Sequence, residues 1–238
     1  MEKKVEGIIL NSIDYKENHK ILYLLTKEGH KSLLVYNAKK IKKGLLNETQ
    51  NLTYLKTTCT DQTLPKVTSI EVVDYYNEIK GDLKKMSVSS YVLEVLYRFI
   101  HPDINPGLLF EYIKAFFAKL KDKDDVKTLL LQFRIKMLYF LGFEPNFKTC
   151  IHCGSNKNLV GLSIYYGAME CVVHASKNNI GNTATNIIRL LYLDKSLEIN
   201  ISDDEAYSYI SKLIDEYYEN HFKDEIKAKK MLQQLNCY

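Results

Sequence analysis

The chain has 238 residues, of which 46% are apolar and 26% are charged, and its formal net charge is +4. This length suits one large domain or two modest ones, and the composition is ordinary for a soluble globular protein with a sizeable core. A net charge this small excludes a surface that is basic throughout, so any anion-binding surface must be a local patch.

Cysteine usage and hydropathy indicate the compartment. The N-terminal sequence lacks an apolar core of signal-peptide length, and the chain has no apolar run long enough to span a membrane. Its five cysteines are an odd number, which without a secretion signal argues against a disulfide framework. We therefore expect a cytoplasmic protein with reduced thiols and no membrane partner.

Residues 1–79 have the pattern of a small all-β domain. Short runs rich in β-branched and aromatic residues, separated by polar breaks, predict strands near residues 5–10, 20–26, 31–36, 52–58 and 68–75. Five such strands suggest an antiparallel barrel or sandwich, and the OB-fold is a five-stranded barrel of about this size.

The apolar period changes to three or four residues after Gly81, which predicts a mostly helical domain over residues 80–238. One helix is expected to stop at His101-Pro102, and another to end at Gly142. Ser202 and Glu205 match a capping box at the start of a later helix. The expected helices lie near residues 83–99, 108–120, 124–141, 187–191, 202–218 and 223–235. The predicted fold class is therefore α+β.

Residues 146–180 lose this periodicity and contain two pairs of metal-ligand type, Cys150-x-x-Cys153 and Cys171-x-x-His174. Two intervening residues let a tight turn direct both side chains of a pair at one ion, and thiolate and imidazole are the ligands of tetrahedral Zn²⁺. Gly154 and Gly167 fit the sharp turns that this requires. A closed set of four ligands leaves no position for water, so the predicted zinc is structural.

Three other interpretations of this segment stay open. The four residues could be unrelated, or His152 could compete as a ligand. Cys171 and His174 could also form a catalytic pair, although a metal-ligand set explains them better. The remaining cysteines, Cys59 and Cys237, have no partners at metal spacing.

A basic stretch follows the third predicted strand. Residues 38–44 contain Lys39, Lys40, Lys42 and Lys43, and such a cationic loop attracts phosphate without sequence preference. Tyr36 and Tyr54 could add base stacking, as aromatic residues do in OB-folds that bind single strands. The alternative is a solvated loop in a lysine-rich protein.

Motifs of catalysis are missing from the sequence. It contains no Walker motif, no G-x-G-x-x-G after a strand, no nucleobase-deaminase signature and no G-x-S-x-G elbow. Acidic residues are dispersed and do not cluster as in a two-metal nuclease. We expect a protein that is not an enzyme.

Several segments together resemble the bacterial RecO family of recombination mediators. They are Gly7 to Lys31 with Asp14-Tyr-Lys-Glu17, the basic stretch Ala38 to Lys43, Leu141-Gly-Phe-Glu-Pro145 before the first ligand pair, Gly167-Ala168 before the second, and Ala228-Lys-Lys-Met-Leu near the end. The order matches over nearly the whole chain. The family more often has cysteine at the position of His174, and Gly-Gly at Gly167-Ala168.

The resemblance implies an OB-fold followed by a helical domain with a zinc finger inside it. It also implies a bacterial, nucleoid-associated protein that binds single- and double-stranded DNA and anneals complementary strands. With RecR, it would help RecA to replace the single-stranded-DNA-binding protein, whose acidic tail it would contact. Lys16 and Lys20, near the first hairpin, would extend the DNA-binding groove. The alternative is a zinc-ribbon adaptor of transcription or translation that binds RNA or protein, and preference for DNA over RNA separates the two.

Overall fold

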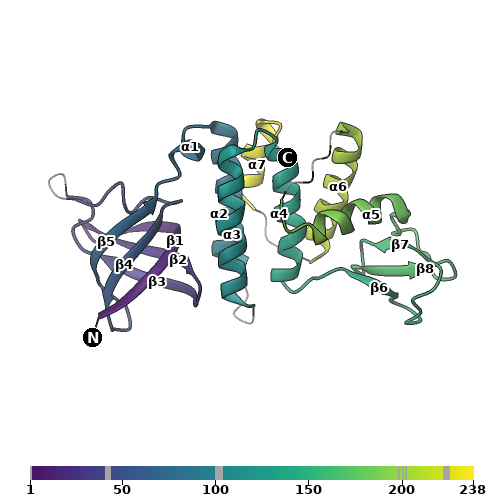
Figure 1. Cartoon of the computed structure of the whole chain (residues 1–238), viewed down its shortest axis with the longest axis horizontal. Coiled ribbons are helices and arrows are strands. Elements are labelled where there is room, and N and C mark those ends of the chain that lie inside the picture. The colour runs from purple at the N-terminus through teal and green to yellow at the C-terminus, as the bar shows by residue number, and fades with distance from the viewer. Residues whose placement is uncertain are drawn as a thin grey trace. The chain divides into compact units, whose positions relative to one another are not determined.

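The computed structural model describes residues 2–40, 44–99, 104–197, 199, 201, 203–221 and 226–238 (Figure 1). The chain divides into two compact units, Met1–Asp122 with Lys227–Leu232, and Lys123–Ile226 with Gln233–Tyr238. The domain boundary expected between residues 79 and 80 stays a prediction. In the described part of the chain, no helix combines the length and the apolar character that crossing a membrane requires.

The first unit begins with five antiparallel strands, as the sequence predicted. They are β1 (Glu2–Tyr15), β2 (His19–Thr26), β3 (Gly29–Val35), β4 (Tyr54–Thr60) and β5 (Val67–Asp74), in the order β3-β2-β1-β4-β5. β1 is long and pairs with both β2 and β4, and its register with β2 shifts between Ile9 and Asn11.

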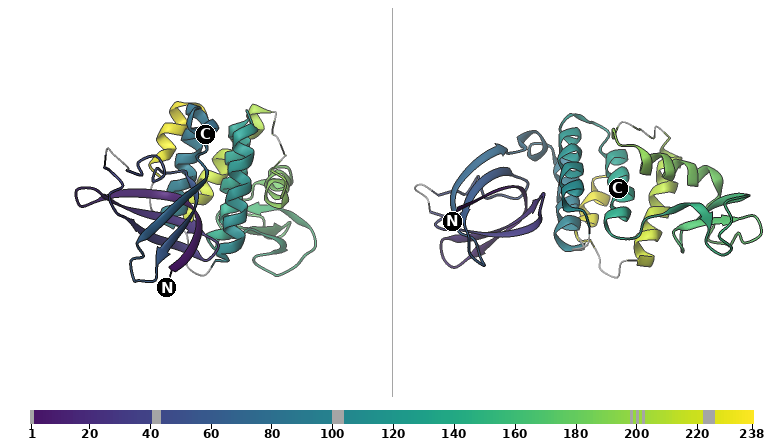
Figure 2. Two further views of the ribbon diagram at one scale, coloured as in Figure 1. Left: turned by 60° about the vertical axis from the view of Figure 1, so that its left-hand side comes forward. Right: turned by 60° about the horizontal axis from the view of Figure 1, so that its bottom comes forward.

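The sheet curves strongly (Figures 1 and 2). Leu34 on β3 bridges Lys66 beside β5, and its N–H donates to the carbonyl of Pro65 over 2.9 Å. This arrangement is of the OB type. The described residues show this single bridge and no ladder between β3 and β5, so a closed barrel is not shown.

Alternating residues of these strands enclose the core of the curved sheet. Its buried members are Val5, Ile9, Leu22, Leu24, Leu33, Val35, Ala38, Leu55 and Cys59. Because successive side chains of a strand point to opposite faces, this core fixes which residues face outward. Cys59 is thus a core residue.

Helices complete the first unit: α1 (Asn77–Lys80), α2 (Leu83–Phe99) and α3 (Pro106–Asp122). α2 lies against β1, and α3 lies against β2. Tyr23 on β2 meets Tyr97 on α2 with ring centroids 5.2 Å apart. The expected stop of α2 at His101-Pro102 lies outside the described residues.

The last helix, α7 (Ala228–Gln234), begins where the Glu94 carboxylate accepts the N–H groups of Lys227 and Ala228.

The second unit is built around α4 (Val126–Phe140), which is buried on most of its sides and contacts α5 (Gly181–Leu193) and α6 (Asp204–His221). The Asp125 carboxylate caps α4 by accepting the N–H of Thr128. The predicted N-cap Ser202 lies outside the described residues. The Asp203 carboxylate accepts the N–H groups of Glu205 and Ala206 at the start of α6.

A second sheet lies where the sequence lost its periodicity. It consists of β6 (Asn146–Cys150), β7 (Leu159–Ser163) and β8 (Ala168–Cys171), in the order β6-β8-β7. β7 runs antiparallel to β8, whereas β6 runs parallel to it. The ends of β6 and β8 position the two predicted ligand pairs.

Candidate metal centre and nucleic-acid interface

Both predicted ligand pairs lie in tight turns at strand ends. Cys150 ends β6, and its carbonyl accepts the N–H of Gly154 over 2.9 Å, which closes the first turn around Cys153. Cys171 ends β8, and its carbonyl accepts the N–H of His174 over 3.0 Å. Gly154 has a φ of 69°, which glycine adopts at no steric cost.

The four side chains converge, and their ligand atoms all lie within 4.8 Å of one another. Cys153 Sγ is 3.9 Å from Cys171 Sγ, and His174 Nδ1 is 3.2 Å from Cys171 Sγ and 3.9 Å from Cys150 Sγ. Tetrahedral bonds of the length usual for zinc would place two thiolates about 3.8 Å apart and a thiolate and an imidazole about 3.6 Å apart. The Cys₃His group therefore fits a metal ion.

The backbone around the cluster favours the thiolate form of a ligand. Burial opposes ionisation of Cys150, but the N–H groups of Cys153, Cys171 and His152 are directed at its sulfur and lower the pKa of the thiol to about 6. The Ser155 N–H lowers the pKa of the Cys153 thiol, but burial and the neighbouring Cys150 and Cys171 outweigh it, so that this pKa is shifted upward. Since the thiolate is the form that binds metals, Cys150 is the thiol of this pair that is better prepared for a cation.

A buried carboxylate connects the two turns. Glu170 is fully buried and accepts hydrogen bonds from the Ser176 N–H and hydroxyl and from the Asn179 amide. Its other oxygen lies 3.3 Å from His152 Nε2. His152 therefore faces Glu170 and is not part of the ligand group. Gly167, with a φ of 61°, lies in the β7–β8 turn and not beside a ligand, so its role differs from the expected one.

Predicted DNA contacts meet at one end of the first sheet, where the β1–β2 turn lies against the segment after β3. The Lys39 N–H donates to the Asn18 carbonyl over 3.2 Å, and the Asn37 N–H donates to His19 Nδ1 over 3.0 Å. The rings of His19 and Tyr36 are 4.6 Å apart. We call this surface the basic–aromatic end; its members are Lys16, His19, Lys20, Tyr36, Lys39, Lys40 and Lys66.

The lysines of the basic–aromatic end differ in whether their ammonium groups already bind other protein groups. Lys16 and Lys40 are exposed. Lys20 donates to the Ser12 hydroxyl over 3.3 Å, and Lys39 is in an ion pair with Asp14, with Nζ 2.7 Å from Oδ2. The hydrogen bond from Lys39 lowers the pKa of Asp14. Lys42 and Lys43 lie outside the described residues.

The two tyrosines considered for stacking also differ. Tyr36 is 44% exposed, and Lys66 Nζ lies 5.5 Å from its ring centroid. Tyr54 is 8% exposed and donates its hydroxyl to Glu6, so its ring is not available to a base. Sequence reasoning missed His19 and Lys66, because only the fold brings them beside Tyr36.

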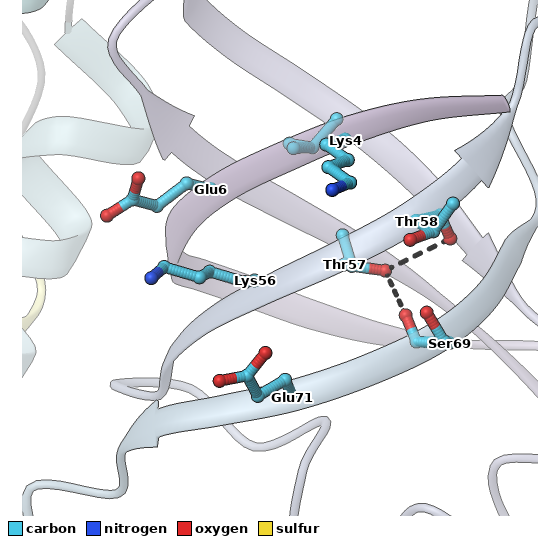
Figure 3. A pocket seen from close by; sticks show the side chains of 8 residues that line it. Lys4, Glu6, Lys56, Thr57, Thr58, Ser69 and Glu71 are labelled. Carbon is cyan, nitrogen blue, oxygen red and sulfur yellow. Dashed lines mark hydrogen bonds between the residues drawn. The ribbon is translucent and has the colours of Figure 1, made fainter.

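A hollow of about 480 Å³ on the outer surface of β1, β4 and β5 has a different character (Figure 3). The register places Lys56 opposite both Glu6 and Glu71, and Lys4 opposite Thr58. Cationic and anionic side chains alternate here, so this surface does not form a cationic groove.

Fold and site together define an OB-fold protein with a helical part that carries a Cys₃His metal-ligand group. Two family models match the chain: "Recombination protein O N terminal" over residues 1–76 and "Recombination protein O C terminal" over residues 80–230. The chain therefore belongs to the RecO family of DNA repair and recombination proteins.

Curated relatives agree with this assignment over nearly their whole length. The DNA repair protein RecO of Bacillus cytotoxicus is 28% identical over 246 residues, covering 100% of this chain and 99% of the relative. Proteins of the same name from Bacillus cereus and Bacillus anthracis are 26% identical with the same coverage.

Proposed function

We propose that this protein is a recombination mediator that binds single- and double-stranded DNA and anneals complementary strands. With RecR, it helps RecA to replace the single-stranded-DNA-binding protein, whose acidic tail it contacts. The family and its repair role support this proposal. Phosphate attraction and base stacking need no fuel, which suits a protein that acts by holding strands and not by catalysis.

The basic–aromatic end is the proposed DNA contact. Lys16, Lys40 and Lys66 supply cations from three separate segments, and Tyr36 and His19 supply rings beside them. Lys20 and Lys39 extend the charged surface, and Lys42 and Lys43 are proposed contacts by their sequence position alone. Because backbone charge and stacking carry no base code, little sequence preference is expected.

The metal is proposed to be a structural Zn²⁺ held by Cys150, Cys153, Cys171 and His174. The donor set and the spacing of the ligand atoms support it. The ion would bind the turn after β6 to the turn after β8, and thereby hold the small sheet in shape. It leaves no open position for a substrate.

The DNA affinity of two charge-reversal variants tests the proposed contact. Lys16→Glu/Lys40→Glu/Lys66→Glu changes the basic–aromatic end, and Lys4→Glu/Lys56→Glu changes lysines of the charge-balanced hollow. Fluorescence anisotropy with a labelled single strand should show a loss of roughly 100-fold or more for the first variant and a much smaller change for the second. Equal losses would contradict this contact surface.

Mediator activity needs its own assay. Wild-type protein should accelerate annealing of complementary labelled strands, and with RecR it should shorten the delay of RecA filament formation on strands coated with the single-stranded-DNA-binding protein. The triple variant should be slow in both assays. If the wild type binds DNA and accelerates neither process, the mediator role is wrong while the DNA contact stands.

A further inference from the structure

We propose that the metal-binding sheet carries a second contact for single-stranded nucleic acid, centred on the aromatic row Tyr165–Tyr166–His152–His174. This inference rests on the proposed function, and it adds a contact in the second unit that is separate from the basic–aromatic end. A chain with two such contacts can hold two strands, which is what annealing requires.

The exposed charged residues of the segment 145–193, which contains the metal-binding sheet, are all basic. Asp and Glu make up 29 of the 238 residues, yet Glu170 is the one acidic residue in the sequence from 145 to 193. Glu170 is fully buried and engaged with Ser176, Asn179 and His152. The basic residues of the same range are all exposed: Lys148, Lys157, Lys177 and Arg189. None of these four is in an ion pair with any residue that the structure describes.

Aromatic side chains form a connected row on this surface. Tyr165 and Tyr166, in the β7–β8 turn, are 55% and 47% exposed, and their ring centroids are 4.9 Å apart. Tyr166 is 5.3 Å from His152, and His152 is 5.5 Å from His174. The row thus runs from the turn to the metal-ligand group. Tyrosine rings exposed to this degree offer faces and edges to an unstacked base.

Backbone contacts hold two of the lysines close to the ligand turns. Lys157 precedes Asn158, whose carbonyl accepts the N–H of Val172 in the second turn over 2.9 Å. Lys177 follows Ser176, which Glu170 binds. Because Glu170 also faces His152, the hydrogen bonds from Ser176 to Glu170 hold the backbone next to Lys177 close to the aromatic row.

A hollow of about 430 Å³ between β6 and α5 repeats the combination of cation and ring. It is lined by Lys148 and Arg189, together with Phe147 and Tyr192, whose ring centroids are 5.8 Å apart. Glu144 also lines it and accepts the Tyr192 hydroxyl over 2.8 Å. The residues of the aromatic row lie in the stretch 145–193, whose one acid is the buried Glu170, so the row is the stronger contact.

These features favour a single strand over other ligands. Cations without exposed acids attract a polyanion, and exposed rings favour bases whose faces are free. In a duplex those base faces are stacked and inaccessible. For a protein partner that binds by apolar contact, the absence of acidic residues would not increase affinity. Stacking and phosphate contacts would together make the site tolerant of sequence.

Two variants of the full chain test the inference, with anisotropy on a labelled oligothymidylate as the readout. Tyr165→Ala/Tyr166→Ala should weaken binding by about tenfold, since stacking is worth about 1–3 kcal/mol per base. Lys157→Glu/Lys177→Glu should weaken it similarly and reduce the slope of log affinity against log salt by about 1 to 2. The matched controls are Tyr209→Ala and Lys212→Glu, exposed positions on α6, which should leave binding unchanged.

Photo-crosslinking of the wild type gives a result that does not depend on how a variant folds. Bromodeoxyuridine-substituted single strands should form adducts on Tyr165, Tyr166 or His152, identified by peptide mass spectrometry. Adducts confined to Tyr36 and His19, with both variants binding like the wild type, would overturn the second contact and leave the proposed function intact. A wild type that binds no DNA at low salt would overturn both.

Discussion

Cys150 shows how a single residue connects chemistry to stability. Its sulfur receives backbone N–H groups that lower the thiol pKa to about 6, and it lies 3.9 Å from His174 Nδ1 in the ligand group. A serine at this position offers neither the thiolate nor its affinity for a soft metal. Substitution of Cys150 by serine should therefore first reduce metal binding and the stability of the fold.

We predict that Cys150→Ser abolishes stoichiometric zinc and lowers the melting temperature by roughly 10 °C, as a loss of about 3 kcal/mol would in a chain of this size. A chelator should lower the wild-type melting temperature similarly. His152→Ala, a change in the same turn at a residue that is not a ligand, should keep the metal. A Cys150→Ser protein that kept its melting temperature and lost DNA binding would refute the structural role.

Asp194 is a second residue whose charge stabilises the fold. It follows α5, and burial opposes its ionisation, but the Ser196 hydroxyl, the N–H groups of Ser196 and Ile199 and the Gln132 amide hold its pKa at about 2. Because the folded-state pKa lies below the ordinary value, its stabilisation is complete above that value and is lost as the pH falls toward 2.

Asp194→Asn should therefore cost about 1 kcal/mol of unfolding free energy at neutral pH, a figure reduced for solvent screening of a partly exposed group. The difference from wild type should shrink between pH 4 and pH 2, a window of about two units set by the two pKa values. Urea unfolding across this range measures it. A difference that stayed constant with pH would show that the carboxylate charge is not the cause.

Residue types and spacing made part of the site predictable. Cys150-x-x-Cys153 and Cys171-x-x-His174 were identified from sequence because metal geometry imposes short-range spacing. No such rule links His19 and Lys66 to Tyr36, since those contacts arise from pairing between distant strands. Whether the lysines named from sequence bind DNA stays a prediction.

Among the elements, α4 carries the most demanding electrostatic arrangement. Arg134 is almost fully buried, and it donates to the Ser211 hydroxyl over 3.0 Å and to Asp215 over 2.5 Å, both on α6. The Tyr238 ring centroid lies 4.3 Å from its guanidinium, and the Tyr238 hydroxyl donates to the same Asp215 carboxylate. This one cation connects α4, α6 and the final residue of the chain.

Arg134→Met should lower the unfolding free energy by about 3 kcal/mol, because it leaves Asp215 without its buried cation. Lys212→Met, which removes an exposed cation from α6, should change it by less than about 0.5 kcal/mol. Equilibrium urea unfolding compares the two. Equal effects would mean that the buried ion pair has no special part in holding α4 to α6.

The five N-terminal strands and the longer helices could be predicted from sequence, whereas the three short strands of the second sheet could not. β1 to β5 and the helices α2, α3, α4 and α6 follow clear apolar periods. β6, β7 and β8 have four or five residues each, and the turns after β6 and β8 carry the Cys₃His group, so no apolar period accumulates over them. Their order, with β8 between β6 and β7, depends on tertiary pairing.

Because the whole molecule has a net charge of only +4, the site at which DNA binds depends on where the lysines gather without acidic neighbours. The basic–aromatic end gathers lysines from the β1–β2 turn, the segment after β3 and the approach to β5. The hollow on β1, β4 and β5 balances its lysines with Glu6 and Glu71. DNA should therefore bind the basic–aromatic end in preference to this hollow of the same unit.

The salt dependence of DNA affinity tests this claim most directly. Anisotropy with a labelled single strand over a salt series gives the slope of log affinity against log salt for the wild type, for Lys16→Glu/Lys40→Glu/Lys66→Glu and for Lys4→Glu/Lys56→Glu. Losing three phosphate contacts should reduce the slope by about 2 in the first variant and leave it nearly unchanged in the second. A wild-type slope retained by both variants would contradict the placement of DNA at the basic–aromatic end.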